Sequence, residues 1–333
     1  MSRFGELLHG GPVDADEIAR VRDVLLFEPP DLQKRLIRFG VLLTLAAAIA
    51  TYGLLGNSVA TVIGAMIVAP LMLPIMGLAF GISIGDGRAI VSSIVVGLGG
   101  IATAVAVGYV LSLAVTSAFD PANNAQIMAR TSPRLVDLMA ALATGLAGAF
   151  ATGRKDVSDT LPGVAIAISL VPPLANVGIL LAVGRSDLAL GSLLLFVTNY
   201  FAILLTGSLV FGLMGFPQAS LLKRTARARR VSVAIVVLMV LLISIPLGIE
   251  SLTVFRQNAA EGRAAEGTRT WLRGSDYRYV SATATDQAVT IVVVGEGTLP
   301  PEDGLRNLLT GRLFGKQVLV EAVPSHALAF ETR

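Results

Sequence analysis

The chain has 333 residues, of which 54% are hydrophobic and only 15% are charged, and its mean hydropathy is +0.74. Soluble domains usually carry about 25% charged residues, so this composition indicates a polytopic membrane protein. A net charge of +3 is too small to indicate a nucleic-acid partner, and a chain without cysteine forms no disulfide or thiolate metal site. The two histidines, His9 and His326, lie outside the apolar runs, so no metal or other cofactor is expected within the membrane.

The polar N-terminal segment, residues 1–35, is predicted to be cytoplasmic. Apolar residues recur at helical spacing between Asp14 and Phe27, which predicts a short amphipathic helix lying on the bilayer or against the core. Seven apolar segments follow, each near or above the roughly 20 residues that a membrane-spanning helix needs. They are residues 36–55, 57–85, 89–117, 134–153, 160–184, 188–214 and 231–249.

Basic residues beside these segments predict their orientation, because cytoplasmic loops are rich in Lys and Arg. The stretch KRTARARR, residues 223–230, holds five basic residues and no acidic one. Lys34, Arg35 and Arg38 mark the start of the first segment in the same way. Six spans between these two points leave both on the cytoplasmic side, and the additional helix at 231–249 then carries the C-terminal region across the membrane.

Residues 250–333 have an ordinary composition and are predicted to begin with a helix that continues out of the membrane. Alternating or apolar runs at 277–284, 288–294 and 317–323 predict strands, and residues 301–312 predict a helix. The expected product is a small extracytoplasmic α+β domain. So small a domain is close to the lower limit of independent stability, which favours packing against the membrane part or against other copies of the chain, as in a homo-oligomer.

The second and fifth apolar segments match each other at a shift of 101 residues, which pairs Leu73 with Leu174, Gly77 with Gly178 and Asp86 with Asp187. Both contain prolines near their centres, where a helix loses a hydrogen bond. We therefore predict two three-helix membrane repeats, residues 36–117 and 134–214, which an odd number of spans makes inverted. Such interrupted helices build midplane substrate sites in secondary transporters. The interrupted segments are predicted either to span the membrane or to form re-entrant hairpins, and the sequence does not separate these alternatives.

Three runs in this region resemble a known family. IGAMIVAPLMLPIMGLA (63–79), DTLPGVAIAISLVPPLANVGILLA (159–182) and GSLLLFVTNYFAILLTG (191–207) are similar to the uncharacterised hydrophobic membrane family called domain of unknown function 389. The resemblance covers about residues 36–216. It implies a protein of the prokaryotic cytoplasmic membrane, and it supplies no agreed activity or site residues.

Polar groups and freed backbone inside the membrane are costly and are often functional. The predicted substrate-binding residues are therefore those at the two interruptions and the polar residues after them: Gly64, Pro70, Pro74, Pro172, Pro173, Asn176, Thr198 and Asn199. Secondary candidates at segment starts are Asn57, Ser58, Thr61, Asp137 and Asp159. Helix capping competes as an explanation for most of these, and an ion pair with Arg130 or Arg134 competes for Asp137. Stripes of small residues, at Gly77, Gly81 and Gly85 and at Gly100, Ala104 and Gly108, favour close helix packing.

These features favour a membrane transporter or channel for a small polar solute, anionic or zwitterionic, bound at the paired interrupted helices near the midplane. The alternative is a membrane-anchored sensor or oligomeric scaffold that uses its C-terminal domain to bind a ligand or partner. No nucleophile elbow, phosphate loop or metal-ligand spacing appears in the membrane part, so an enzyme is not expected. The expected partners are a small molecule or ion, membrane lipids and further copies of the chain.

Overall fold

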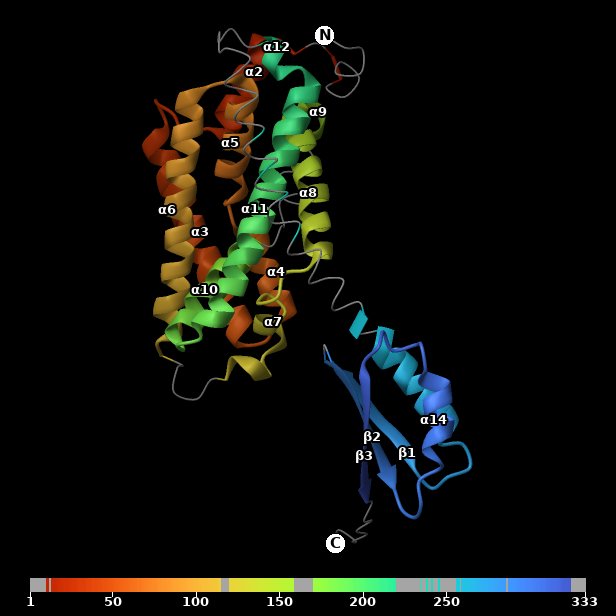
Figure 1. Ribbon diagram of the computed structural model, residues 1–333. Coiled ribbons are helices and arrows are strands. Elements are labelled where there is room, and N and C mark those ends of the chain that lie inside the picture. Colours follow the sequence, from red (N-terminus) through yellow and green to blue (C-terminus); the bar gives the residue numbers. More distant parts are fainter. Residues whose placement is uncertain are drawn as a thin grey trace. The chain divides into compact units, whose positions relative to one another are not determined.

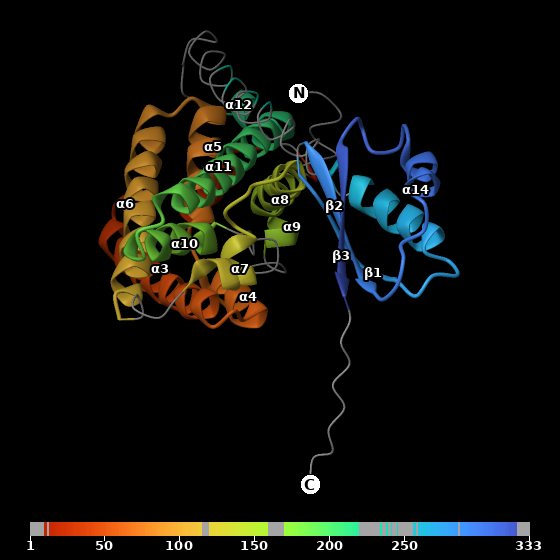
Figure 2. The same cartoon turned by 60° about the horizontal axis from the view of Figure 1, so that its bottom comes forward.

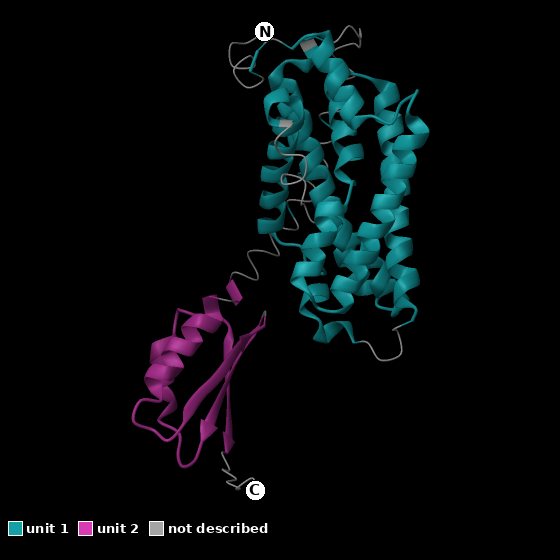
Figure 3. Ribbon diagram, turned by 180° about the vertical axis from the view of Figure 1, so that it is seen from behind, with its two compact units in different colours: residues 1–247 teal, residues 248–333 magenta. Residues whose placement is uncertain are grey.

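The computed structural model describes residues 10–11, 13–114, 120–158, 170–219, 256–257, 259–285 and 287–324, with the single residues 234, 238, 241 and 245. The chain divides into two compact units, Met1–Leu247 and Gly248–Arg333 (Figure 3). The first unit is helical, and the second contains a small sheet.

The described elements of the helical unit follow one another as labelled in Figure 1. They are α2 (Ala15–Leu25), α3 (Leu32–Leu55), α4 (Val59–Val68), α5 (Met72–Ile84), α6 (Gly87–Ser112), η1 (Pro121–Asn123), α7 (Ala125–Met128), α8 (Leu135–Gly153), α9 (Lys155–Ser158), α10 (Val171–Ala182), α11 (Ser186–Met214) and α12 (Phe216–Ala219).

Among the described residues, four helices are long and apolar enough to cross a membrane, namely α3, α6, α8 and α11. The bent pair α4 and α5 raises this number to five if it counts as one span. The sequence predicted seven spans. The first half of the predicted fifth segment and nearly all of the seventh lie outside the described residues, and α10, the described part of the fifth, is too short to span alone.

The interruption between α4 and α5 bends the chain without reversing it. The axes of the two helices differ by 47°, whereas a re-entrant hairpin would bring the chain back beside itself. Helix α4 ends before Pro70, since Ala69 is already extended, with φ −70° and ψ 122°. The residue before a proline is driven out of the helical region by the proline ring, which explains why the break falls here.

The other prolines of the predicted interruptions begin helices rather than break them. Pro74 is the third residue of α5, while Pro172 and Pro173 are the second and third residues of α10. The first turn of a helix has no intrahelical partner for its N–H groups, so these prolines cost no hydrogen bond. All three are buried.

Helices α5 and α10 form the centre of the helical unit. Every residue of α5 except Leu73 is buried, and so are residues 171–180 of α10. Both short helices pack against α6 and α11, and α10 also packs against α3 (Figure 2). The approach of α10 to α6 requires glycine, because a Cβ atom on Gly108 would lie 2.5 Å from the carbonyl oxygen of Ala175.

The second unit contains a three-stranded sheet of β1 (Arg278–Ala284), β2 (Ala288–Gly295) and β3 (Gln317–Pro324), in that spatial order. Strands β1 and β2 are antiparallel, and β2 and β3 are parallel, joined through α14 (Glu302–Leu309). The helical residues 259–271 precede the sheet. Val289, Ile291 and Val293 of β2 pack with Leu305 and Leu309 in one small core, so the small α+β region predicted from the sequence is present.

Candidate functional site

A cavity of about 380 Å³ lies among α4, α7, α8 and α11. Its lining combines apolar and polar side chains: Met66, Gln126, Ala129, Arg130, Asp137, Ala140, Ala141, Thr144, Leu195 and Asn199. A volume near the lower end of the usual range of about 300–1,000 Å³ for ligand pockets suits a small solute. Three of its residues, Gln126, Ala129 and Arg130, come from α7 and the turn that follows.

The short helix α7 is held in place by two asparagine side chains at its N-terminal end. The Nδ2 atom of Asn124 donates a hydrogen bond of 2.7 Å to the Leu54 carbonyl at the end of α3, and its Oδ1 caps α7 by accepting from the Ile127 N–H. The Oδ1 of Asn57 accepts from the Gln126 N–H at 3.0 Å. Asn57, a secondary candidate from the sequence, therefore positions α7 and does not line the cavity.

Arg130 is the cationic residue of the cavity wall. One terminal nitrogen donates to the main-chain carbonyl of Gln126 and to its Oε1 atom, the latter at 3.3 Å. The Nε atom is buried and has no hydrogen-bond partner among the described residues. Burial lowers the pKa of the guanidinium, with no compensating carboxylate, although an arginine stays charged at neutral pH. The cavity wall thus carries a cation whose charge is not neutralised by a described acidic group.

The acidic residue of the cavity lining, Asp137, is already bound by another residue. Asp137 accepts a hydrogen bond of 2.8 Å from the Arg134 N–H at the start of α8 and lies 3.6 Å from the Arg134 Nε atom. Of the two ion pairs considered for Asp137, the structure therefore contains the one with Arg134. Asp137 nevertheless lines the cavity beside this pair.

Asn176 lies behind the cavity and holds the turn that carries Arg130. Its fully buried side chain donates to the Ser192 Oγ at 2.7 Å and to the Ile127 carbonyl at 3.2 Å. The Ser192 hydroxyl in turn donates to the Arg130 carbonyl at 3.0 Å. The Asn176 Oδ1 is buried with no described partner. Asn176 therefore joins α10, α7 and α11, whereas the sequence suggested direct solute contact or repair of the backbone at the prolines.

The remaining candidates are dispersed. Asn199 lines the cavity, whereas the buried Thr198 hydroxyl donates to the Leu194 carbonyl of its own helix. Ser58 caps α4 by accepting from the Thr61 N–H, which leaves both residues in the capping role. A Cβ atom on Gly64 would meet open space, but Gly64 does not line the cavity.

None of Pro70, Pro74, Pro172 and Pro173 lines the cavity. Asp159 lies outside the described residues. A solute site at the paired prolines therefore stays a prediction, separate from the cavity beside α4 and α8. The described residues contain no group of His, Cys, Asp or Glu side chains suited to a metal ion.

Arg130 and Gln126 are not among the predicted site residues, because they lie between the apolar segments 89–117 and 134–153. The pattern Asn124–Ile127–Met128 was the available signal, since an N-cap followed by apolar residues predicts a helix that packs back onto the protein. Gly191 marks the receiving surface: a Cβ atom there would collide with the Thr131 carbonyl.

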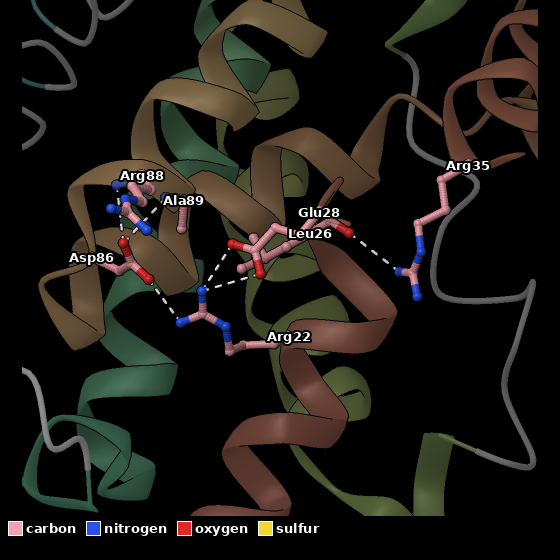
Figure 4. A network of polar contacts seen from close by, with 7 residues as sticks. All are labelled: Arg22, Leu26, Glu28, Arg35, Asp86, Arg88 and Ala89. Atoms are coloured by element: carbon pink, nitrogen blue, oxygen red, sulfur yellow. Dashed lines mark hydrogen bonds and ion pairs between the residues drawn. The ribbon is translucent and has the colours of Figure 1, made fainter. Parts of the chain in front are cut away.

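A second polar cluster lies at the other end of the helical unit, where α2 meets α5 and α6 (Figure 4). Arg22 donates at 2.7 Å to Asp86 and at 2.8 Å to Glu28. The other oxygen of Asp86 caps α6 by accepting from the N–H groups of Arg88 and Ala89. Burial opposes ionisation of the Asp86 carboxyl, but the hydrogen bonds from Arg22 and Ala89 outweigh it and lower the pKa below its ordinary value. In this cluster the charge of Arg22 is paired with Asp86 and Glu28, whereas Arg130 has no acidic partner among the described residues.

Comparison with known proteins agrees with the family resemblance. The family described as "Domain of unknown function (DUF389)" matches residues 66–205. The "Uncharacterized protein MJ0678" of Methanocaldococcus jannaschii is 30% identical over 175 residues, which is 53% of this chain and 53% of that protein. The chain thus spans about half the length of the curated relative that it matches, and no solved structure matches it. The residues that match the DUF389 family, 66–205, include α5, α10 and every residue that lines the Arg130 cavity.

Proposed function

We propose that this protein is a membrane transporter or channel for a small anionic solute, with the Arg130 cavity as its binding site. The observation that carries the proposal is the Arg130 guanidinium, which lines the cavity and has, among the described residues, neither an acceptor for its buried Nε nor a carboxylate partner. Burying a charge without compensation is costly, and a bound anion would supply the missing compensation.

The other lining groups suit a small anion. Arginine presents a planar fork of donors that matches carboxylate and phosphate oxygens. Gln126 and Asn199 add amide groups to the same wall. The one acidic lining residue, Asp137, is bound by Arg134, so the charge left to attract a solute is positive. A zwitterion would be accepted only if its ammonium group displaced Arg134 from Asp137.

The arrangement of the helices supports transport rather than simple binding. Helix α5 packs on its successor α6 and on α11, while α10 packs on its successor α11 and on α6. Each of these two short helices thus packs against the helix that follows it and against the corresponding helix of the other predicted repeat. Such a symmetric arrangement is expected for two three-helix repeats. In Figure 1, α5 lies toward the α2 end of the unit and α10 toward the α7 end, as expected if the second repeat is inverted. Inverted repeats with interrupted helices are common in secondary transporters.

The test is a flux assay on the full chain in liposomes, with chloride, phosphate, acetate and the zwitterion glycine as probes. We expect at least one anion to be taken up, and Arg130→Gln to reduce that uptake at least tenfold. Arg130→Lys should give an intermediate rate, because it retains the charge but loses the fork. Arg185→Gln, which removes an exposed arginine paired with Asp187, serves as the matched control. Uptake that is equal in the wild type and Arg130→Gln would overturn the assignment, and uptake of glycine alone would change the solute class.

A second candidate function, a membrane-anchored sensor, is favoured by one observation. The sheet unit holds a cavity of about 670 Å³, lined by apolar residues of α14 and β3 with Trp271, Arg306 and Lys316 at the same site. Val318 lines it and is 41% exposed, so Val318→Lys should block it without disturbing the core. If this substitution abolishes a ligand-induced shift in melting temperature that Arg130→Gln leaves intact, the sensor function takes precedence.

A further inference from the structure

A long apolar groove lies between α3 and α6, separate from the Arg130 cavity. Its volume is about 790 Å³. The α3 side and the turn before it supply Phe27, Leu32, Leu36, Phe39, Gly40 and Leu43, and the α6 side supplies Val91, Val95, Val96, Gly99, Gly100 and Thr103. Both Gly40 and Gly99 leave open space where a Cβ atom would be. The two glycines therefore help to keep the groove hollow.

One end of the groove is polar. Arg88, in the first turn of α6, lines it, and Ser92 lines it one turn further on. Residues four apart share a helix face. The Ser92 hydroxyl is buried and has no hydrogen-bond partner among the described residues. The Arg88 side chain forms no ion pair with a described acidic residue, because Asp86 and Glu28 are both bound by Arg22.

The groove's length fits an acyl chain. From Gly87 to Thr103 the α6 wall runs for about 24 Å at the rise of an α-helix. One leaflet of the hydrocarbon core is about 15 Å deep, half of the usual thickness. A groove with a cation and an unsatisfied hydroxyl at one end, followed by an apolar wall longer than a leaflet, has the polarity of a phospholipid.

We infer that this groove binds an anionic phospholipid, with its phosphate at Arg88, its glycerol or ester oxygens at Ser92, and an acyl chain along Gly40 and Gly99. The charge at this end favours an anionic headgroup over a neutral one. Arg38 lies near the start of α3 at the same end and is exposed, whereas Lys34 and Arg35 beside it are paired with Asp31 and Asp23. Basic pockets between membrane helices are typical sites for anionic headgroups. The inference does not depend on the proposed anion transport, because none of these residues lines the Arg130 cavity.

The experiment measures the melting temperature of the delipidated full chain in detergent, titrated with phosphatidylglycerol, phosphatidylcholine or free glycerol 3-phosphate. We expect phosphatidylglycerol to raise the melting temperature more than phosphatidylcholine does, and glycerol 3-phosphate to have no effect. Arg88→Gln should reduce the phosphatidylglycerol effect to that of phosphatidylcholine. Gly99→Leu should abolish the effect of both lipids by filling the groove.

Gly212→Leu is the matched control, since a Cβ atom on Gly212 also meets open space, but on α11 outside the groove. It should retain the full lipid response. The inference fails if the two lipids stabilise the wild type equally, if Gly99→Leu responds like Gly212→Leu, or if glycerol 3-phosphate alone reproduces the shift. The last result would identify a site for a free anion instead. Because each variant is compared with its own lipid-free melting temperature, a general loss of stability does not mimic the expected result.

Discussion

The two ends of the helical unit each contain a partly buried arginine, and the two arginines are treated differently. At the α2 end, Arg22 is bound by two carboxylates, and one of these also caps α6. At the α7 end, Arg130 is bound by a glutamine and a carbonyl, and its Nε has no described acceptor. Within the described part of the chain, arginine is thus paired with carboxylates at one end and has no acidic partner at the other.

The difference between Arg22 and Arg130 distinguishes an arginine that stabilises the fold from one that is a candidate for binding a solute. A buried ion pair loses stability when one partner is removed, because the other charge is left behind. An unpaired buried cation already has that cost in the wild type, so its removal costs little, and its presence calls for a purpose beyond stability. An ionisable group whose pKa is shifted by burial in a cavity is a candidate for a functional site.

The largest effect is expected where Asp86 binds Arg22 and caps α6. Asp86→Ala removes the cap of α6 and one partner of Arg22, and should lower the free energy of unfolding by about 2 kcal/mol. Thermal unfolding in detergent measures the change. Asp187→Ala is the control, because Asp187 occupies the matching position 101 residues later, where its ion pair with Arg185 is exposed. If both variants lose the same free energy of unfolding, the Asp86–Arg22 pair is no more important for stability than the exposed Asp187–Arg185 pair.

The next effect tests the unpaired arginine. Arg130→Gln should change the free energy of unfolding by no more than about 1 kcal/mol, since lost hydrogen bonds to Gln126 are offset by the relief of an uncompensated charge. Arg22→Gln should lower the free energy of unfolding more than Arg130→Gln does, because it leaves Asp86 and Glu28 without their cationic partner. If Arg130→Gln lowers the free energy of unfolding more than Arg22→Gln does in the absence of anions, the interpretation of the two arginines is wrong.

A smaller effect follows from pH. The pKa of Asp86 is lower in the folded protein than its ordinary value of 3.8. The ionised carboxylate therefore contributes stability above that ordinary value, and this contribution is lost as the pH falls toward and through the folded pKa. Melting temperatures measured from pH 6 downward should fall less steeply in Asp86→Asn than in the wild type. Parallel curves would show that Asp86 does not contribute in this way.

The sequence predicts the regular parts of this fold well, because apolar periodicity and strand alternation are local signals. The long helices α3, α6, α8 and α11 and the three strands overlap the predicted segments, with ends that differ by a few residues. The packing role of the small-residue stripe is also confirmed at Gly108, which contacts α10. The prolines were harder to interpret, since a proline that breaks a helix and one that begins a helix give the same pattern.

The site was predicted only in part, because its geometry depends on contacts between distant segments. Asn199 and Asp137 were named as candidates and line the cavity. Arg130 was not, since its burial arises when α7 folds back onto α11, a contact over 62 residues between Arg130 and Ser192. The local pattern at Asn124 predicts a helix, but it does not identify α11 as the helix against which α7 packs. The apolar groove was missed for the same reason, because α3 and α6 are separated along the chain by the α4–α5 pair.

The smallest effect concerns the support of the Arg130 turn. Asn176→Leu replaces a buried amide by an apolar side chain of similar size, so it removes two hydrogen bonds together with one unsatisfied oxygen. The net loss of stability should be only about 0.5 kcal/mol, because the lost hydrogen bonds are partly offset by removal of the unsatisfied oxygen. Faster amide hydrogen exchange of residues 127–131 should accompany it, because the Ile127 carbonyl loses a donor from α10.

Thr198→Val is the control for this change. The Thr198 hydroxyl is buried as well, but it bonds to the Leu194 carbonyl within α11 and reaches no other element. Its removal should leave hydrogen exchange at residues 127–131 unchanged. If Asn176→Leu also leaves it unchanged, the α7 turn is held by Asn124 and Asn57 alone, and the position of Arg130 is then set from α3 and the start of α4 rather than from the second interrupted segment.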